Sequence, residues 1–311
     1  MHGNISLVKK LLYCIPIIPV YIVIFIVVYA FHTEVMFDKY GVTILKIIFV
    51  PIFEFFALMT LVCHIFATLT NPGEIDQSLI SKDVEFETHK GKLFCKKCNI
   101  KRPERAHHCK SCERCILKMD HHCPWIGGCV GYYNQKFFYQ FVFYATVGDF
   151  IAFCFLVFKL FHADFNVKNE EAKVHSWADI VYIMWSPIII LIGTILSLAM
   201  TISIGMLLYY QTYLIMNNMT TVENAKFNNP EDNIYYSPQK LHNFKIILGM
   251  SYYKWPFPIF EQNIYNNGYD FALNRGNESL PLPKLDNKGF VELNEETDVS
   301  KDGGSTKDFK K

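Results

Sequence analysis

Four long apolar stretches alternate with polar segments along this chain. They cover residues 11–31, 47–69, 137–158 and 183–210, and each has about the 20 residues that an α-helix needs to cross a ~30 Å hydrocarbon layer. Their only acidic residues are Glu54 and Asp149. A charge at that depth is costly, so we expect both carboxyls to be protonated or hydrogen-bonded. The pattern predicts an all-α integral membrane protein with four transmembrane helices.

The distribution of lysine and arginine predicts the orientation of these helices. Residues 1–10 contain two lysines and no acid, and residues 91–118 contain nine basic residues against two acidic ones. The loops 32–46 and 159–179 are nearly balanced. Because basic residues accumulate in cytosolic segments, we expect both termini and the segment between the second and third spans to be cytosolic. Residues 216–283 then form a cytosolic C-terminal region, and the polar residues 284–311 a disordered tail.

Composition agrees with a membrane protein and excludes other classes. Apolar residues make up 51% of the 311 residues, charged residues 19%, and the mean hydropathy is +0.15. Such a chain is too apolar for a disordered protein or an ordinary soluble one. Its net charge of +1 argues against a globally basic protein that binds nucleic acid.

Cysteine and histidine are concentrated in the cytosolic segment 91–136. Seven of the ten cysteines lie between Cys95 and Cys129, together with four histidines. In the reducing cytosol this clustering favours metal ligation over disulfides. Structural zinc takes four Cys or His ligands. Two sites of three cysteines and one histidine each would use six cysteines and leave one over, and that cysteine would be available for chemistry. The spacing does not say which cysteine it is.

The run from Asp120 to Cys123 suggests one candidate. Neighbouring side chains in an extended segment point apart, so His122 can face a metal while His121 faces Cys123. A histidine can take the proton of a thiol, and a carboxylate such as Asp120 orients the imidazole. The alternative is that Cys123 is one more ligand in a zinc-binding scaffold without catalysis.

Residues 95–138 resemble the Asp-His-His-Cys (DHHC) domain of protein S-acyltransferases, the palmitoyltransferases. The match follows the long spacing Cys-x2-Cys-x9-His-Cys-x2-Cys-x2-Cys-x4-Asp-His-His-Cys-x5-Cys-x4-Asn-x3-Phe. Two further family motifs are matched, Thr-Thr-x-Glu at residues 220–223 and an aromatic C-terminal motif that includes Asn243, Gly249 and Trp255. One departure is Asn71 in Asn-Pro-Gly, where the family usually has aspartate; asparagine forms such a turn equally well.

The resemblance implies ligands, an activity and partners. Cys123 would be the nucleophile that accepts a long acyl chain from palmitoyl-CoA and passes it to membrane-proximal cysteines of substrate proteins, with His121 as base and Asp120 orienting it. Thr221, Glu223 and Asn243 would brace the site. The enzyme would reside in the endomembrane system, in the Golgi, the endoplasmic reticulum or the plasma membrane. Two structural Zn²⁺ ions would be held by two interleaved ligand sets: Cys95, Cys98, His108 and Cys115, and Cys109, Cys112, His122 and Cys129.

An acyl chain also needs an apolar cavity beneath Cys123. Trp125 suits the membrane interface, and four residues of the third span recur at helical spacing, so we expect Trp125 and this helix face to contact the acyl chain and line the cavity. Small residues at its deep end would leave room for a long chain. The alternative is that the phenylalanines only pack against a neighbouring helix. The four residues are Phe138, Phe141, Ala145 and Gly148.

Overall fold

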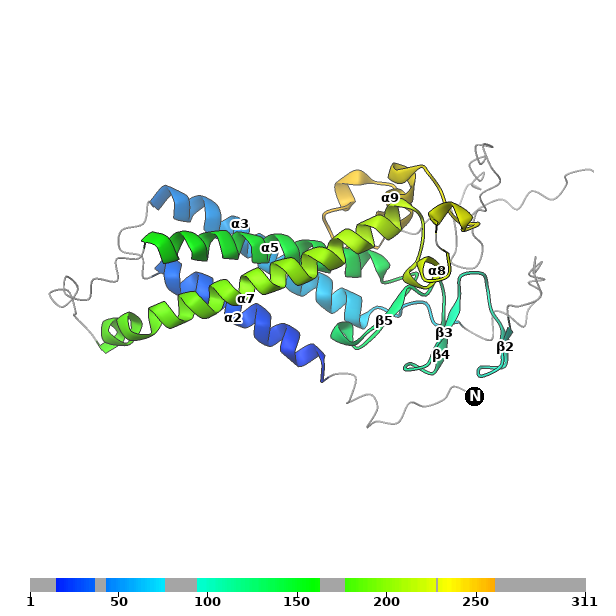
Figure 1. The fold of residues 1–311 in the computed structure, drawn as a ribbon, viewed down its shortest axis with the longest axis horizontal. Coiled ribbons are helices and arrows are strands. Elements are labelled where there is room, and N and C mark those ends of the chain that lie inside the picture. The colour runs from blue at the N-terminus through cyan, green and yellow to red at the C-terminus, as the bar shows by residue number, and fades with distance from the viewer. Residues whose placement is uncertain (1–14, 37–42, 76–93, 163–176, 228, 261–311) are drawn as a thin grey trace, which may run out of the picture.

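The computed structural model describes residues 15–36, 43–75, 94–162, 177–227 and 229–260. Four long helices lie side by side, and the strands and short C-terminal helices gather at one end of them (Figure 1). Helix α5 packs against both α3 and α7, and α2 contacts α5 and α7. The long helices are α2 (Ile17–Met36), α3 (Thr43–Leu69), α5 (Gln135–His162) and α7 (Trp177–Met216).

Three of these helices are long and apolar enough to cross a membrane. They are α3, α5 and α7, whereas the apolar part of α2, Ile17–Thr33, is shorter. The first expected span began at residue 11, and residues 1–14 lie outside the described residues, as do the predicted cytosolic segment 1–10 and the tail 284–311. Helix α2 starts just after Pro16 and carries Pro19 in its first turn, where helical amides have no carbonyl partner and proline is tolerated.

The other helices extend past the predicted spans 47–69, 137–158 and 183–210. Helix α7 begins at Trp177 and continues to Met216, and α5 begins at Gln135. Polar residues at the helix ends hid these extensions in the sequence, because hydropathy marks the apolar part of a helix and not its termini.

The cysteine-rich region is built from three β-hairpins, so the expectation of an all-α protein is wrong there. Each hairpin has two short antiparallel strands, and none pairs with another hairpin. They are β1 (Phe94–Cys95) with β2 (Ile100–Lys101), β3 (His107–Cys109) with β4 (Arg114–Ile116), and β5 (His121–Cys123) with β6 (Gly128–Val130). An isolated two-stranded sheet buries too few side chains to be stable alone, so bound metal ions would have to supply part of its folding free energy.

Short helices follow α7 and fold back over this end of the bundle. We call residues 221–260 the C-terminal cap; its elements are α8 (Thr221–Asn224), η3 (Pro230–Asp232), α9 (Lys240–Leu248) and η4 (Tyr252–Lys254). One face of α5 holds the cap through backbone carbonyls. Lys136 Nζ donates to the carbonyls of Leu248 and Ile259, Gln140 to those of Trp255 and Phe257, and Tyr144 to that of Pro256.

The Asn-Pro-Gly turn joins α3 to the cysteine-rich region. Asn71 Oδ1 accepts hydrogen bonds from the amides of Gly73 and Glu74, as aspartate would. Gly73 has a φ of +108°, a conformation that favours glycine, and its carbonyl accepts from Leu117 N at 2.8 Å. The substitution of asparagine for aspartate therefore keeps the turn.

Candidate active site and metal clusters

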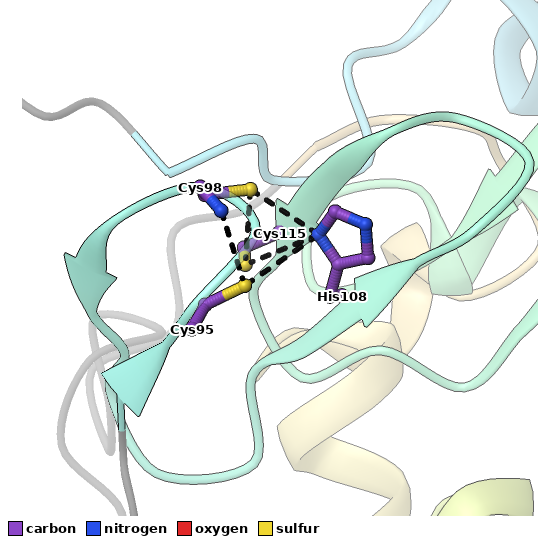
Figure 2. Close-up of side chains that lie close together, drawn as sticks. All are labelled: Cys95, Cys98, His108 and Cys115. Carbon is purple, nitrogen blue, oxygen red and sulfur yellow. Dashed lines mark hydrogen bonds between the residues drawn. The ribbon is translucent and has the colours of Figure 1, made fainter.

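The first Cys/His cluster joins the β1–β2 and β3–β4 hairpins. Figure 2 shows the sulfurs of Cys95, Cys98 and Cys115 converging on His108 Nδ1. The three sulfur–nitrogen distances are 3.6, 3.2 and 3.9 Å, and the sulfurs of Cys98 and Cys115 are 3.7 Å apart. The hairpin register places His108 directly opposite Cys115, so the pairing of β3 with β4 forms half of the cluster.

The second cluster repeats this arrangement one hairpin later. His122 Nδ1 lies 3.6, 3.4 and 3.7 Å from the sulfurs of Cys109, Cys112 and Cys129, and β5–β6 pairing sets His122 opposite Cys129. All four donor atoms of each cluster lie within 4.8 Å of one another.

Both clusters fit zinc. A tetrahedral ion with Zn–S bonds of about 2.3 Å and Zn–N bonds of about 2.0 Å separates its ligand atoms by roughly 3.5–3.8 Å. The separations of the donor atoms given above range from 3.2 to 3.9 Å. Three thiolates and one imidazole are also a typical structural zinc set, and the two ligand sets are interleaved in the sequence because Cys115 of the first set follows Cys109 and Cys112 of the second. Each cluster could therefore hold a metal ion.

Asp120 and His121 form a hydrogen-bonded pair beside the second cluster, in which Asp120 is buried and His121 partly exposed. Asp120 is fully buried, and its Oδ2 lies 2.7 Å from His121 Nδ1. Burial raises the pKa of this carboxyl, but hydrogen bonds from His121, Thr221 N and Gln211 outweigh it and bring the pKa below its usual value. An ionised carboxylate only accepts, so Nδ1 donates to Asp120 and Nε2 is the ring nitrogen left to exchange a proton with another group.

Cys123 lies at the end of β5, two residues after His121 and on the same side of the strand. Burial lowers the pKa of His121, but hydrogen bonds with Asp120 and with Cys123 raise it to about 9. Among the described cysteines between Cys95 and Cys129, Cys123 alone belongs to neither cluster. The structure thus brings together a thiol, an imidazole and a carboxylate in the order that activates a nucleophile.

Cys123 also borders an apolar cavity of about 440 Å³ that extends between the long helices. All five residues expected to line it do so: Trp125, Phe138, Phe141, Ala145 and Gly148. The sequence did not show that α2, α3 and α7 supply the other walls. Their contributions include Val20, Val23, Phe53, Ala57, Ile204 and Leu207.

The two intramembrane acids have different surroundings. Asp149 borders the cavity beside Gly148. Glu54 Oε1 lies 2.7 Å from His32 Nε2 on α2. The sequence offered no lysine or arginine at matching depth, and the partner of Glu54 is instead a histidine.

The Thr-Thr-x-Glu segment ties the C-terminal cap to the site. Thr221 N donates to Asp120 Oδ1 at 2.6 Å. Thr220 and Glu223 form a capping box at the start of α8. Glu223 also accepts two hydrogen bonds from Arg105, at 2.6 and 2.7 Å, and both side chains are buried. This ion pair joins residues 118 positions apart and was not visible in the sequence.

Asn243 and Trp255 organise the interior of the cap. Asn243 Nδ2 donates to the carbonyls of Met216 and Ser237, which fixes α9 against the end of α7. Trp255 Nε1 donates to the carbonyl of Gly249. Sequence reasoning also missed Gln211 on α7, whose Nε2 donates to Asp120 Oδ2 at 3.0 Å.

Residues 88–228 match the protein family described as DHHC palmitoyltransferase. The probable protein S-acyltransferase 15 of Arabidopsis thaliana is 34% identical over 242 residues, which are 72% of this chain and 88% of the relative. Palmitoyltransferase PFA3 of Debaryomyces hansenii is 32% identical over 59% of this chain and 47% of its own length. Palmitoyltransferase ZDHHC15 of Xenopus laevis is 31% identical, with 65% and 57% covered. The chain thus spans about half the length of some curated relatives and most of another.

Proposed function

This chain belongs to the DHHC palmitoyltransferase family, and from that premise we propose that it is a protein S-acyltransferase with Cys123 as its nucleophile. It would transfer a long acyl chain from palmitoyl-CoA to membrane-proximal cysteines of substrate proteins. The observation that carries the proposal is the position of Cys123: outside both metal clusters, beside the hydrogen-bonded Asp120–His121 pair and at the edge of the apolar cavity.

The reaction has two steps. The Cys123 thiol gives its proton to His121 Nε2, and the sulfur attacks the thioester carbon of acyl-CoA. The bond to the CoA sulfur breaks, and the CoA thiolate leaves with the proton held by His121. In the second step a substrate thiol loses its proton to His121 and attacks the acyl-enzyme, which releases Cys123. One thioester replaces another each time, so no further energy source is needed.

Asp120 acts on this chemistry through His121. Its carboxylate keeps the proton on Nδ1, which leaves Nε2 to exchange protons with sulfur, and it stabilises the imidazolium that forms. Thr221 and Glu223 hold Asp120 and the cysteine-rich region against the C-terminal cap, and Asn243 holds the cap against α7. We assign these three residues a supporting role and no contact with substrate.

Two Zn²⁺ ions fit the chemistry of the clusters formed by Cys95, Cys98, His108 and Cys115 and by Cys109, Cys112, His122 and Cys129. Bound zinc supplies folding free energy to small hairpins of this kind. Neither ion takes part in acyl transfer, because each ligand set is closed.

The acyl chain would lie in the cavity next to Cys123. Its apolar lining keeps the acyl chain out of water, where each exposed CH₂ group costs about 0.8 kcal/mol. Phe138 and Phe141 lie toward the cytosolic end of α5, and Ala145 and Gly148 lie deeper along the same helix, so the cavity keeps room for a long chain at its deep end.

The membrane arrangement we propose has four spans, and the first is the apolar stretch 11–31, whose residues from Ile17 onward belong to α2. Both termini and residues 91–136 would face the cytosol of an endomembrane, in agreement with the basic charge of 91–118. This places Cys123 at the cytosolic surface, where acyl-CoA and substrate cysteines are accessible.

The proposal is tested by incubating detergent-purified protein with alkyne-tagged palmitoyl-CoA. Label on the wild-type protein that neutral hydroxylamine removes, and its absence from Cys123→Ser, would support the thioester intermediate. Cys154→Ser is the matched control, because Cys154 is an exposed thiol on α5, and it should load like the wild type. A wild-type chain that binds two zinc ions per chain but never loads would overturn the proposal in favour of a zinc-bearing membrane scaffold.

A further inference from the structure

A chain of hydrogen bonds links the turn after Cys123 to two long helices. His64 on α3 is fully buried. Its Nε2 lies 3.0 Å from the carbonyl oxygen of Trp125, and its Nδ1 lies 3.1 Å from the hydroxyl of Tyr21 on α2. A carbonyl oxygen only accepts, so Nε2 must carry the proton. Nδ1 is then an acceptor, and the Tyr21 hydroxyl donates to it. Tyr21 therefore donates a hydrogen bond to His64, and His64 donates one to the carbonyl of Trp125.

The hydrogen-bonded residues Tyr21, His64 and Trp125 lie beside the cavity wall next to Cys123. Trp125 belongs to η1 (Pro124–Ile126), the turn that Cys123 begins, and its side chain borders the cavity. Tyr21 follows Val20, which lines the same cavity from α2. The His64 ring also packs on Phe141 of α5, with 4.9 Å between ring centres. Three helices and the Cys123 turn therefore meet at one imidazole.

We propose that Tyr21 and His64 are positioning residues that fix the mouth of the acyl cavity. They hold the α2 wall and the Cys123 turn at one separation, so that the chain of an incoming acyl-CoA enters beside the sulfur. Both nitrogens of His64 are engaged, and neither is available to Cys123, so His64 is not a second base. This inference rests on the proposed function, because it assumes that the cavity takes an acyl chain.

The first test compares two replacements of His64 by acyl-enzyme formation with palmitoyl-CoA. His64→Phe keeps the ring but removes both hydrogen bonds and leaves the Trp125 carbonyl without a donor. We expect KM to rise roughly tenfold, the size expected for one unsatisfied buried acceptor, with kcat within about twofold. His64→Gln should restore KM, because its amide nitrogen reaches the place of Nε2, and His64→Asn should not, because its shorter side chain does not.

Tyr21→Phe gives an independent readout that needs no change at His64. It should raise KM by about threefold alone and add nothing in the His64→Phe background, since the two groups act in series. Tyr29→Phe is the matched control: Tyr29 lies on the same helix with an exposed side chain, and its replacement should leave KM unchanged.

Three results would overturn the inference. The first is a His64→Phe enzyme with the wild-type KM for palmitoyl-CoA, and the second is an equal loss in His64→Phe and His64→Gln. The third is a fall in the alkylation of Cys123 by iodoacetamide, because the Asp120–His121 pair is not touched by these changes. A wild-type protein that cannot be loaded at all would instead refute the proposed function, so the two failures are distinguishable.

Discussion

Arg105→Met tests how the C-terminal cap is held to the cysteine-rich region. The side chains of Arg105 and Glu223 are 1% and 6% exposed, and two bonds of 2.6 and 2.7 Å join them. Arg105 also donates to the carbonyl of Asn218 at 2.9 Å. Methionine fills much of the same space without a charge, so the Glu223 carboxylate is left buried without its cation.

The expected cost follows from burial. Removing one partner of a buried ion pair costs about 3–5 kcal/mol. At 2–4 °C per kcal/mol, this lowers the melting temperature by roughly 6–20 °C. Arg114→Met is the matched control. Arg114 bonds to Glu74 at the same 2.7 Å, but these side chains are 33% and 30% exposed. A pair of that exposure contributes about 0–1 kcal/mol, so its loss should shift the melting temperature by a few degrees at most.

The pH dependence of the stability loss tests whether the unpaired Glu223 carboxylate causes it. Burial raises the pKa of Glu223, but in the wild type Arg105 outweighs burial and holds this pKa below its usual value. Arg105→Met removes the charge and the hydrogen bonds of Arg105 and leaves the hydrogen bond from Thr220 N and the charge of Lys118, so the folded pKa of Glu223 rises relative to the wild type. The wild type then loses more stability than the variant as the pH falls, and the deficit of the variant should shrink between about pH 7 and about pH 5.

Thermal unfolding of the detergent-solubilised protein measures both effects. Adding Glu223→Gln to Arg105→Met should recover most of the lost stability, because the buried charge is gone. Equal shifts for Arg105→Met and Arg114→Met, or a deficit that grows on acidification, would refute the reasoning.

Three further predictions concern the site. Gly148→Phe should fold, since a Cβ there meets Phe56 Cβ only at 3.5 Å, and should fill the deep end of the cavity. Losing two buried methylenes at about 0.8 kcal/mol each predicts roughly a tenfold fall in palmitoyl relative to myristoyl loading, and an unchanged preference would contradict the assignment of the cavity. Gln211→Leu removes one hydrogen bond to Asp120 and should slow loading about tenfold at unchanged KM for acyl-CoA; wild-type rates would exclude a role in orienting Asp120. Cys112→Ala should lower zinc content by more than one ion per chain and expose the cysteine-rich region to protease, whereas loss of one ion alone would show that the clusters fold independently.

Residue types and clustering predicted metal ligation, because Cys-x2-Cys pairs and neighbouring histidines are typical zinc ligands. The division into two ligand sets came from the resemblance to the DHHC domain, since the spacing alone left open which cysteine is spare. The sequence did not predict hairpins there, because strands of two or three residues have no readable alternation. The pairing of His108 with Cys115 and of His122 with Cys129 depends on the register of those hairpins.

Long-range contacts were the part that the sequence could not reveal. The resemblance implied that Glu223 braces the site, but nothing in the sequence paired it with Arg105 or paired His64 with Trp125. Their roles arise only when the bundle brings distant segments together: His64 meets Trp125 from 61 positions away. The cavity-facing side of α5 was predictable from helical periodicity, but the walls supplied by α2 and α7 depend on how the helices pack.

Transfer from a preformed acyl-enzyme tests the central claim most directly. Protein loaded with alkyne-tagged palmitate at Cys123 would be freed of acyl-CoA and mixed with a lipid-anchored peptide that carries one cysteine near the membrane surface. We predict that label leaves Cys123 and appears on the peptide cysteine at the same rate, with no transfer to the cysteine-to-serine peptide. Label that remains on Cys123, or that reaches the peptide only when acyl-CoA is present, would contradict Cys123 as the carrier of the acyl chain.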